Sequence, residues 1–121
     1  MTTKEVAQRY YEMYQANKRL EIQNTMYGHD AVSTEPAHVA QRGMAVVTTG
    51  LDAIKAKGEA RRSMIEEIHG TICSEPLVAG NFFTVSLSQD VTFKGRPRAT
   101  LAEIAVFEVR DGKIVHEQFF F

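Results

Sequence analysis

The feature that most constrains the fold is a change in the spacing of apolar residues near His69. From there to the end of the chain, apolar side chains recur at every second position, which is the period of a β-strand with one buried face. Turn signals interrupt the pattern at residues 80–81, 94–95 and 111–112. The sequence therefore predicts a four-stranded antiparallel meander. Its expected strands cover residues 71–78, 82–93, 98–109 and 114–121.

The preceding residues have the period of helices. Val6, Tyr10 and Tyr14 lie four residues apart and predict a first helix. It is expected to begin near Thr3, whose hydroxyl can cap the first turn, and to end near Ala16. Because helices that precede a meander pack against one of its faces, we expect an α+β protein with one domain, residues 1–121. Three further elements are expected: a helix over 20–27 that Gly28 ends, a strand over 30–35 before Pro36, and a helix over 51–68 that Thr48 or Thr49 caps.

Composition and charge argue against several classes of partner. The 14 basic and 15 acidic residues nearly cancel. The densest basic cluster, residues 55–62, is interrupted by Glu59 as in a solvated helix face, so no nucleic acid partner is expected. No apolar run approaches the ~20 residues that span a bilayer, so no membrane partner is expected either. The N-terminus lacks a signal-peptide pattern, which predicts a cytoplasmic protein.

The cysteine and histidine content argues against a metal site. Cys73 is the single cysteine, so it cannot form an internal disulfide, and we expect an inert, packed thiol. The four histidines show no spacing that would place two ligands on one face of a helix or strand. We therefore expect neither a metal nor an organic cofactor.

Several segments resemble a known family. The stretch MYGHDAVSTEP, residues 26–36, closely resembles the part of the delta-5-3-ketosteroid isomerases that carries their catalytic base directly before a proline. The resemblance continues through TGLDAIKAK, KGRP and FEVRDGKI and spans nearly the whole chain. The chain is thus similar to the ketosteroid isomerase-like and SnoaL-like proteins of the nuclear transport factor 2-like superfamily. This resemblance implies a cone-shaped, curved antiparallel sheet that packs on three N-terminal helices and encloses a pocket.

The same resemblance implies roles for three residues. Glu35 matches the base, Tyr11 matches the tyrosine that donates to the substrate oxyanion, and Glu103 matches the protonated aspartate beside that tyrosine. Both glutamates stand where the isomerases have aspartates. A carboxyl group in a partly apolar pocket has a raised pKa, which suits it to move a proton at a carbon next to a carbonyl group.

Each of these positions has an alternative. Tyr14 replaces Tyr11 as the donor if the helix is rotated. Glu103 lies on an otherwise apolar strand face, where it can donate to an oxyanion when protonated, act as a base when ionised, or form an ion pair in a subunit contact. Gln89 is the lone amide on the apolar face of its strand and is a further pocket candidate. The candidate proton carriers besides the carboxyl groups are His69 and His116.

The hairpin turn at residues 110–112 decides which side chains share a face with Glu103. A two-residue Asp-Gly turn pairs Arg110 with Lys113 and places Glu103 on the side of His116. A three-residue loop with a glycine bulge pairs Val109 with Lys113 instead, and this one-residue slip turns the last strand over. The resemblance favours the second arrangement. It adds three pocket candidates: Glu117, Phe119 and Phe121.

Together these residues lead to a functional hypothesis. We expect an isomerase or a polyketide cyclase-like enzyme that transfers a proton on an apolar carbonyl compound, with Glu35 as base and Tyr11 and Glu103 as oxyanion donors. A dehydratase or hydrolase that uses the same pocket is one alternative. A non-catalytic module that binds a lipophilic ligand or a protein partner is another, because a fold alone does not define a function. The apolar residues on the second face of the sheet, such as Ile104 and Val106, favour a homodimer through that face.

Overall fold

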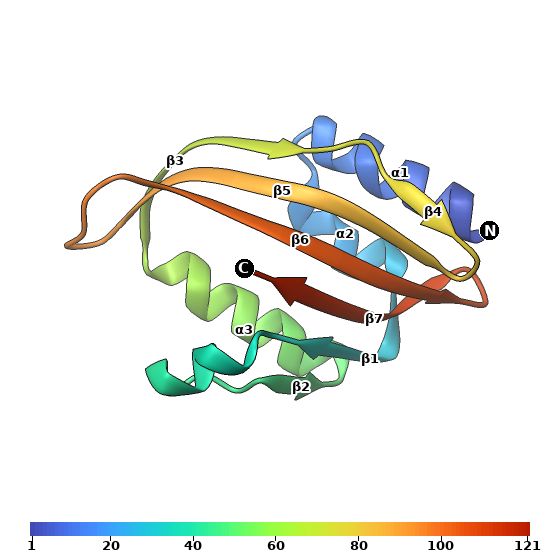
Figure 1. Cartoon of the computed structure of the whole chain (residues 1–121), viewed down its shortest axis with the longest axis horizontal. Helices are drawn as coiled ribbons and strands as arrows, with labels where there is room; N and C mark the ends of the chain where they lie inside the picture. Colours follow the sequence, from blue (N-terminus) through green and yellow to red (C-terminus); the bar gives the residue numbers. More distant parts are fainter.

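The structure is a computed structural model that describes residues 1–121 and consists of helices packed on one curved sheet (Figure 1). The helices are α1 (Thr3–Gln15), α2 (Arg19–Met26), the short 3-10 helix η1 (Ala37–Arg42) and α3 (Leu51–Ser63). The strands are β1 (Tyr27–Thr34), β2 (Val47–Thr49), β3 (Ile65–Cys73), β4 (Leu77–Ala79), β5 (Phe82–Phe93), β6 (Ala99–Arg110) and β7 (Lys113–Phe120). No helix is long and apolar enough to cross a membrane.

The seven strands form one unclosed sheet, which confirms the expected α+β class. Their order is β2-β1-β7-β6-β5-β3, and β4 pairs with the first residues of β5. Strand β1 runs parallel to β7, while every other pair is antiparallel. The sheet is therefore mixed and not purely antiparallel. The difference arises because the last strand inserts between β6 and the strand that follows α2.

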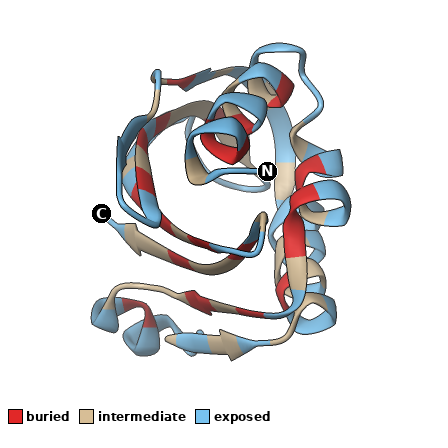
Figure 2. Cartoon of the chain, turned by 90° about the vertical axis from the view of Figure 1, so that its right-hand side faces the viewer, coloured by how far each residue is buried: buried red, intermediate tan, exposed pale blue.

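The sheet curves around α1 (Figure 2). The buried residues of β5 alternate along the strand, and Phe83 among them contacts Tyr10 of α1, so they lie on the inner, concave side. Phe83 and Phe107 are cross-strand partners on this side, and their rings stack with centroids 4.7 Å apart. The Tyr10 ring of α1 lies 4.8 Å from the Phe107 ring. Since aromatic side chains bury large apolar areas, this cluster anchors α1 to the sheet.

Helix α1 begins at Thr3, as expected, but a different residue caps it. Its N-cap is Thr2, whose hydroxyl accepts a hydrogen bond from the backbone N–H of Glu5 while the Glu5 carboxylate accepts one from the backbone N–H of Thr2. This reciprocal pair is a capping box, and the prediction that Thr3 caps the helix was wrong. Similarly, α3 is capped by Gly50, because Thr48 and Thr49 belong to β2.

The third helix is shorter than expected, because residues 65–68 belong to β3. Ile65 and Ile68 lie three residues apart, a spacing that is typical of a helix face. In the structure they pair with Phe93 and Val91, and the strand between them contains a β-bulge. The extra residue of the bulge turns both isoleucines to the same face of the sheet. The expected strand over 71–78 is also divided, into β3 and β4, at the segment that contains Pro76.

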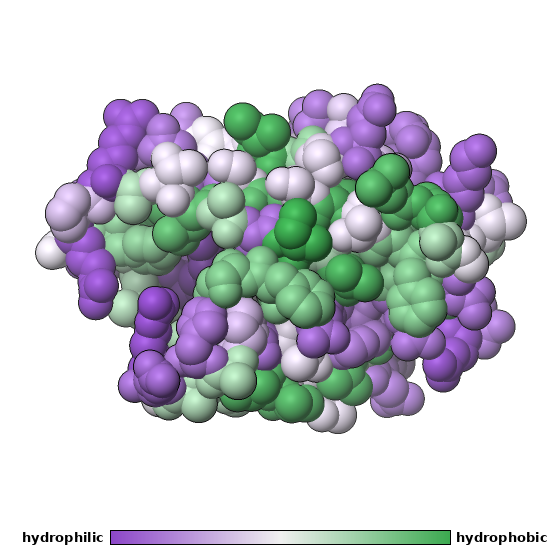
Figure 3. All heavy atoms as spheres, in the orientation of Figure 1, coloured by the Kyte–Doolittle hydropathy of each residue, from purple (hydrophilic) through white to green (hydrophobic).

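The convex side of the sheet carries a band of exposed apolar side chains. Figure 3 shows these hydrophobic groups gathered over β5, β6 and β7. Ile104 and Phe120 are cross-strand neighbours that are 45% and 50% exposed. We define the convex patch as Ile72, Phe82, Ile104 and Phe120, whose side chains all lie on this face.

Candidate functional site

The polar residues of the concave side lie on β1, β6 and β7. Ser33 of β1 pairs with Glu117 of β7, which pairs in turn with Phe107 of β6. Ser33 and Glu117 are the only buried polar residues, with 0% and 4% exposure. Because side chains alternate along a strand, Glu103 and Glu35 also project to this side. The concave side therefore carries three carboxyl groups: Glu117 of β7, Glu103 of β6, and Glu35 directly after β1.

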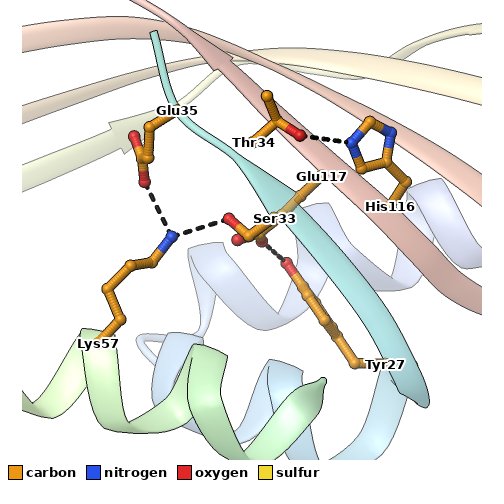
Figure 4. A network of polar contacts seen from close by, with 7 residues as sticks. All are labelled: Tyr27, Ser33, Thr34, Glu35, Lys57, His116 and Glu117. Atoms are coloured by element: carbon orange, nitrogen blue, oxygen red, sulfur yellow. Dashed lines mark hydrogen bonds and ion pairs between the residues drawn. The ribbon is translucent and has the colours of Figure 1, made fainter. Parts of the chain in front are cut away.

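Glu35 is held by an ion pair at the end of β1. The Lys57 ammonium reaches from α3 and donates to the Glu35 carboxylate at 2.9 Å and to the Ser33 hydroxyl at 2.8 Å (Figure 4). The side chains of Lys57 and Glu35 are 25% and 12% exposed. The predicted base is thus paired with a cation and is not free in the site.

Glu117 has a different partner. The hydroxyl of the buried Tyr27, the first residue of β1, donates a hydrogen bond to the Glu117 carboxylate (Figure 4). Burial, followed by the neighbouring Glu117 charge, raises the pKa of Tyr27 well above its ordinary value. Tyr27 therefore remains a protonated donor at neutral pH and satisfies the buried carboxyl group.

Tyr27→Phe should lower the free energy of unfolding by about 1–3 kcal/mol, because it leaves the buried Glu117 carboxyl without its donor. Urea unfolding would measure the loss. Tyr11→Phe is the matched control, since it removes only an exposed hydrogen bond and is expected to change stability by less than about 0.5 kcal/mol. Equal losses in the two variants would contradict the role given to Tyr27.

Glu103 is the carboxyl group whose ionisation is most altered. It is half-buried on β6 opposite Leu87, with neither an ion pair nor a side-chain hydrogen bond. Burial raises the pKa of Glu103 from 4.5 to about 7; the Glu35 carboxylate adds to the rise and the Arg61 guanidinium opposes it. Both protonation states are therefore well populated near neutral pH.

Two cations of α3 face this side of the sheet. Ile54, on the same helix, is buried, and Lys57 and Arg61 follow it at three and seven residues, which places all three on one helix face. Arg61 donates to the amide oxygen of Gln89 at 2.8 Å. The predicted pocket residue Gln89 therefore lies beneath this helix. The expectation that residues 55–62 form a solvated face was wrong for Lys57.

The structure separates the two tyrosines that were candidates for the donor. The Tyr11 hydroxyl accepts a hydrogen bond from the exposed Gln15 amide at 3.2 Å. Tyr14 is half-buried against the core; burial raises its pKa, and the charge of Glu103 adds to the rise. The charge of Glu103 thus contributes to the raised pKa of Tyr14 and of the buried Tyr10.

The last hairpin combines the two arrangements that were considered. Arg110 pairs with Lys113 across a two-residue turn in which Asp111 and Gly112 both have positive φ, 51° and 75°. This is the geometry of a type I′ turn. A bulge within β7 then shifts the pairing by one residue, which gives the register expected from a three-residue loop. Glu117 and Phe119 consequently share the concave side with Glu103, as the resemblance implied, although not through the expected loop.

The remaining candidates lie away from the carboxyl groups. His69 bonds to the Thr92 hydroxyl at 2.9 Å and His116 to the Thr34 hydroxyl at 3.0 Å, both on the convex side. Figure 4 shows Thr34 and His116 on the opposite side of β1 from Ser33. The Phe121 ring is 52% exposed, and its carbonyl group is bonded to the His38 ring.

Three residues of the site were missed by sequence reasoning: Ser33, Lys57 and Tyr27. The spacing of Lys57 from Ile54 was a usable signal for its orientation. No local pattern identifies Tyr27, which lies 90 residues from Glu117 in the chain. Cys73 is buried on the concave side opposite Leu87, and burial raises the pKa of its thiol to about 11, as fits a packed thiol.

Two depressions in the surface lie away from the carboxyl groups of the candidate site. One depression of about 460 Å³ lies between the N-terminus and the β6–β7 turn, and another of about 350 Å³ lies beside Gly70. Neither contains a predicted site residue. No three His, Cys, Asp or Glu side chains are grouped so that they could hold a metal ion.

Comparisons with known proteins agree with the fold. A family model described as a SnoaL-like domain matches residues 1–121. A protein of Mesorhizobium loti, described as a putative SnoaL-like polyketide cyclase (carbohydrate phosphatase), is 27% identical with both chains fully covered and a TM-score of 0.90. An NTF2-like protein of unknown function from Burkholderia pseudomallei is 21% identical over 100% of this chain and 92% of that chain, with a TM-score of 0.79. TerC, crystallised with polyporic acid, is 18% identical over 98% and 90% of the chains, with a TM-score of 0.78. Curated protein sequences include no match.

Proposed function

This chain belongs to the SnoaL-like family over its whole length, and from that premise we propose that it is a small-molecule proton-transfer enzyme of the isomerase or cyclase type. Its substrate is an apolar carbonyl compound that binds against the concave side of the sheet. The observation that carries the proposal is Glu103, a half-buried carboxyl group without a partner whose pKa is raised to about 7. A general base works best when its pKa lies near the working pH.

In the proposed reaction, the ionised Glu103 carboxylate removes a proton from the carbon next to the carbonyl group. The electron pair of the C–H bond moves to the carbonyl oxygen and forms an enolate, which the Tyr14 hydroxyl stabilises by donating a hydrogen bond. Protonated Glu103 then gives the proton to a different carbon of a conjugated enolate. Alternatively, the enolate carbon attacks a second carbonyl group of the same molecule, and protonated Glu103 gives its proton to the resulting alkoxide oxygen. The first outcome is an isomerisation and the second an aldol cyclisation.

Glu35 takes a supporting role in this scheme. The resemblance gave it the role of base, but its carboxylate is already engaged by the Lys57 ammonium at 2.9 Å. Its negative charge instead contributes to the raised pKa of Glu103. Tyr14 takes the role of oxyanion donor in place of Tyr11, because the charge of Glu103 acts on Tyr14.

The test uses a neutral bicyclic ketone, 2-tetralone, in deuterated buffer at pH 7. Proton NMR follows the replacement of the hydrogens next to the carbonyl group by deuterium. We expect the folded protein to accelerate this exchange above the buffer rate, with saturation in ketone. Exchange at the buffer rate with this and related bicyclic ketones would remove the enzymatic proposal.

That outcome would favour a second candidate, a non-catalytic module that binds a lipophilic ligand. The specific observation in its favour is that two of the three carboxyl groups already have partners, Lys57 for Glu35 and Tyr27 for Glu117. Buried polar groups with satisfied hydrogen bonds are also what a purely structural site requires. Dehydratase or hydrolase chemistry remains compatible with the same carboxyl groups.

We further propose that the protein forms a homodimer through the convex patch. Exposed apolar side chains gathered on one face mark an interaction surface. Ile104→Lys should abolish the dimer, because it places a charge inside the apolar contact, and light scattering should then give the mass of one chain. Lys4→Ala, a change on the exposed face of α1, is the control and should leave the dimer intact. A wild-type protein that stays monomeric at high concentration would refute the proposal.

A further inference from the structure

The second cation of α3, Arg61, has no acidic partner. The salt bridges of the chain join Lys57 to Glu35, His69 to Glu67, Arg98 to Asp90 and Arg110 to Glu108. Arg61 contacts only neutral groups: the Gln89 amide oxygen, and the Phe93 ring, whose centroid lies 5.6 Å from its guanidinium carbon. An arginine with five N–H donors and a single acceptor retains donors for a further partner.

The neutral contacts also fix where Arg61 points. Arg61 is exposed, and these two contacts direct its guanidinium group toward Gln89 and Phe93. Gln89 and Phe93 both lie on the concave side of β5. The cation is therefore positioned over the same face of the sheet as Glu103, whose ionisation it influences.

Apolar surface adjoins this cation. Leu101 pairs with Gln89 across β5 and β6 and is 41% exposed, although it lies on the concave side, two residues from Glu103. Phe119 is half-buried on the same side, where the Lys57 ammonium lies 6.0 Å from its ring centroid. Since Lys57 is already occupied by Glu35 and Ser33, Arg61 is the cation that is free to bind a ligand.

We propose that the Arg61 guanidinium is an anion-binding subsite, so that the preferred ligand is an aromatic or polycyclic carbonyl compound that carries a carboxylate or phenolate oxygen. The anionic oxygen pairs with Arg61, and the apolar body covers Leu101 and Phe119 beside Glu103. Planar anionic groups suit a guanidinium, which can donate two parallel hydrogen bonds to them. This inference rests on the proposed function, because it names the substrate class of the same site.

The test compares 2-naphthoate with 2-naphthamide, which differ in charge but hardly in shape. Isothermal titration calorimetry at pH 6, where most Glu103 is protonated, measures both dissociation constants. We expect the wild type to bind 2-naphthoate at least about tenfold more tightly than 2-naphthamide, as is typical of a hydrogen bond to a charged group. Arg61→Gln should remove this preference. Arg62→Gln is the same change at the next residue of α3, which is also exposed but makes no hydrogen bond to Gln89, and it should preserve the preference.

Equal affinity of the wild type for the two probes, or no binding of either, would overturn the subsite. So would an equal loss in Arg61→Gln and Arg62→Gln, which would indicate a general effect of surface charge. Exchange of neutral 2-tetralone, measured on the same proteins, separates this result from the proposed function. Exchange without a naphthoate preference rejects only the subsite, whereas a preference without exchange rejects only the catalysis.

Discussion

Glu103→Gln is expected to lower kcat/KM for proton exchange by about 10²- to 10⁴-fold, the range that a positioned general base contributes. The amide keeps the shape of the side chain but cannot accept the proton. In the wild type, kcat/KM should rise as the pH increases through about 7, because only the ionised carboxylate is a base. The variant should show no such rise. Measurement of 2-tetralone exchange between pH 5 and 9 checks both expectations.

Glu108→Gln is the matched control for this experiment. Glu108 lies on the same strand, but on the convex side, where it pairs with Arg110 at 2.7 Å. Its replacement should leave the exchange rate within about twofold of the wild type, since the residue lies across the sheet from the site. Glu35→Gln should lower the exchange rate less than Glu103→Gln does. A larger loss for Glu35→Gln would return the role of base to Glu35, as the family resemblance alone implied.

The architecture could be predicted because its signals are local. The period of two in β5 and β6 and the Asp111-Gly112 turn are visible within a few residues. The errors occur where tertiary pairing overrides the local pattern. Ile65 and Ile68 have helical spacing, but a bulge in β3 produces the same spacing on one face of a sheet. The parallel pairing of β1 with β7 joins segments from the two ends of the chain, and no short-range pattern encodes it.

For the candidate site, too, the sequence could predict what depends on local signals and could not predict what depends on tertiary contacts. Alternation along β6 and the family resemblance both placed Glu103 on the inner face, and the structure agrees. Its partners depend on contacts between distant elements. The ion pair of Glu35 requires α3 to lie across β1, and the orientation of Tyr14, in place of Tyr11, depends on how α1 rotates on Phe83 and Phe107. Such orientations follow from packing and not from spacing alone.

The second prediction with a large effect concerns stability. As the pH rises, ionisation of Glu103 should lower the free energy of unfolding. Its pKa is raised from 4.5 to about 7 on folding, mainly by burial, so the folded state binds a proton more tightly than the unfolded state. The carboxyl group therefore has no destabilising effect below about pH 4.5, and the effect grows until it is complete above about pH 7. A pKa difference of this size corresponds to about 3 kcal/mol in the free energy of unfolding.

Urea unfolding of the wild type and Glu103→Gln at pH 4.5 and pH 8 isolates this contribution. Other carboxyl groups titrate in both proteins, so only the difference between them reports on Glu103. We expect Glu103→Gln to gain up to about 3 kcal/mol relative to the wild type between the two pH values, because the amide is never ionised. If the difference does not change with pH, Glu103 is solvated or ion-paired in the folded protein. The carboxyl group would then lack the ionisation behaviour on which its proposed role as base depends.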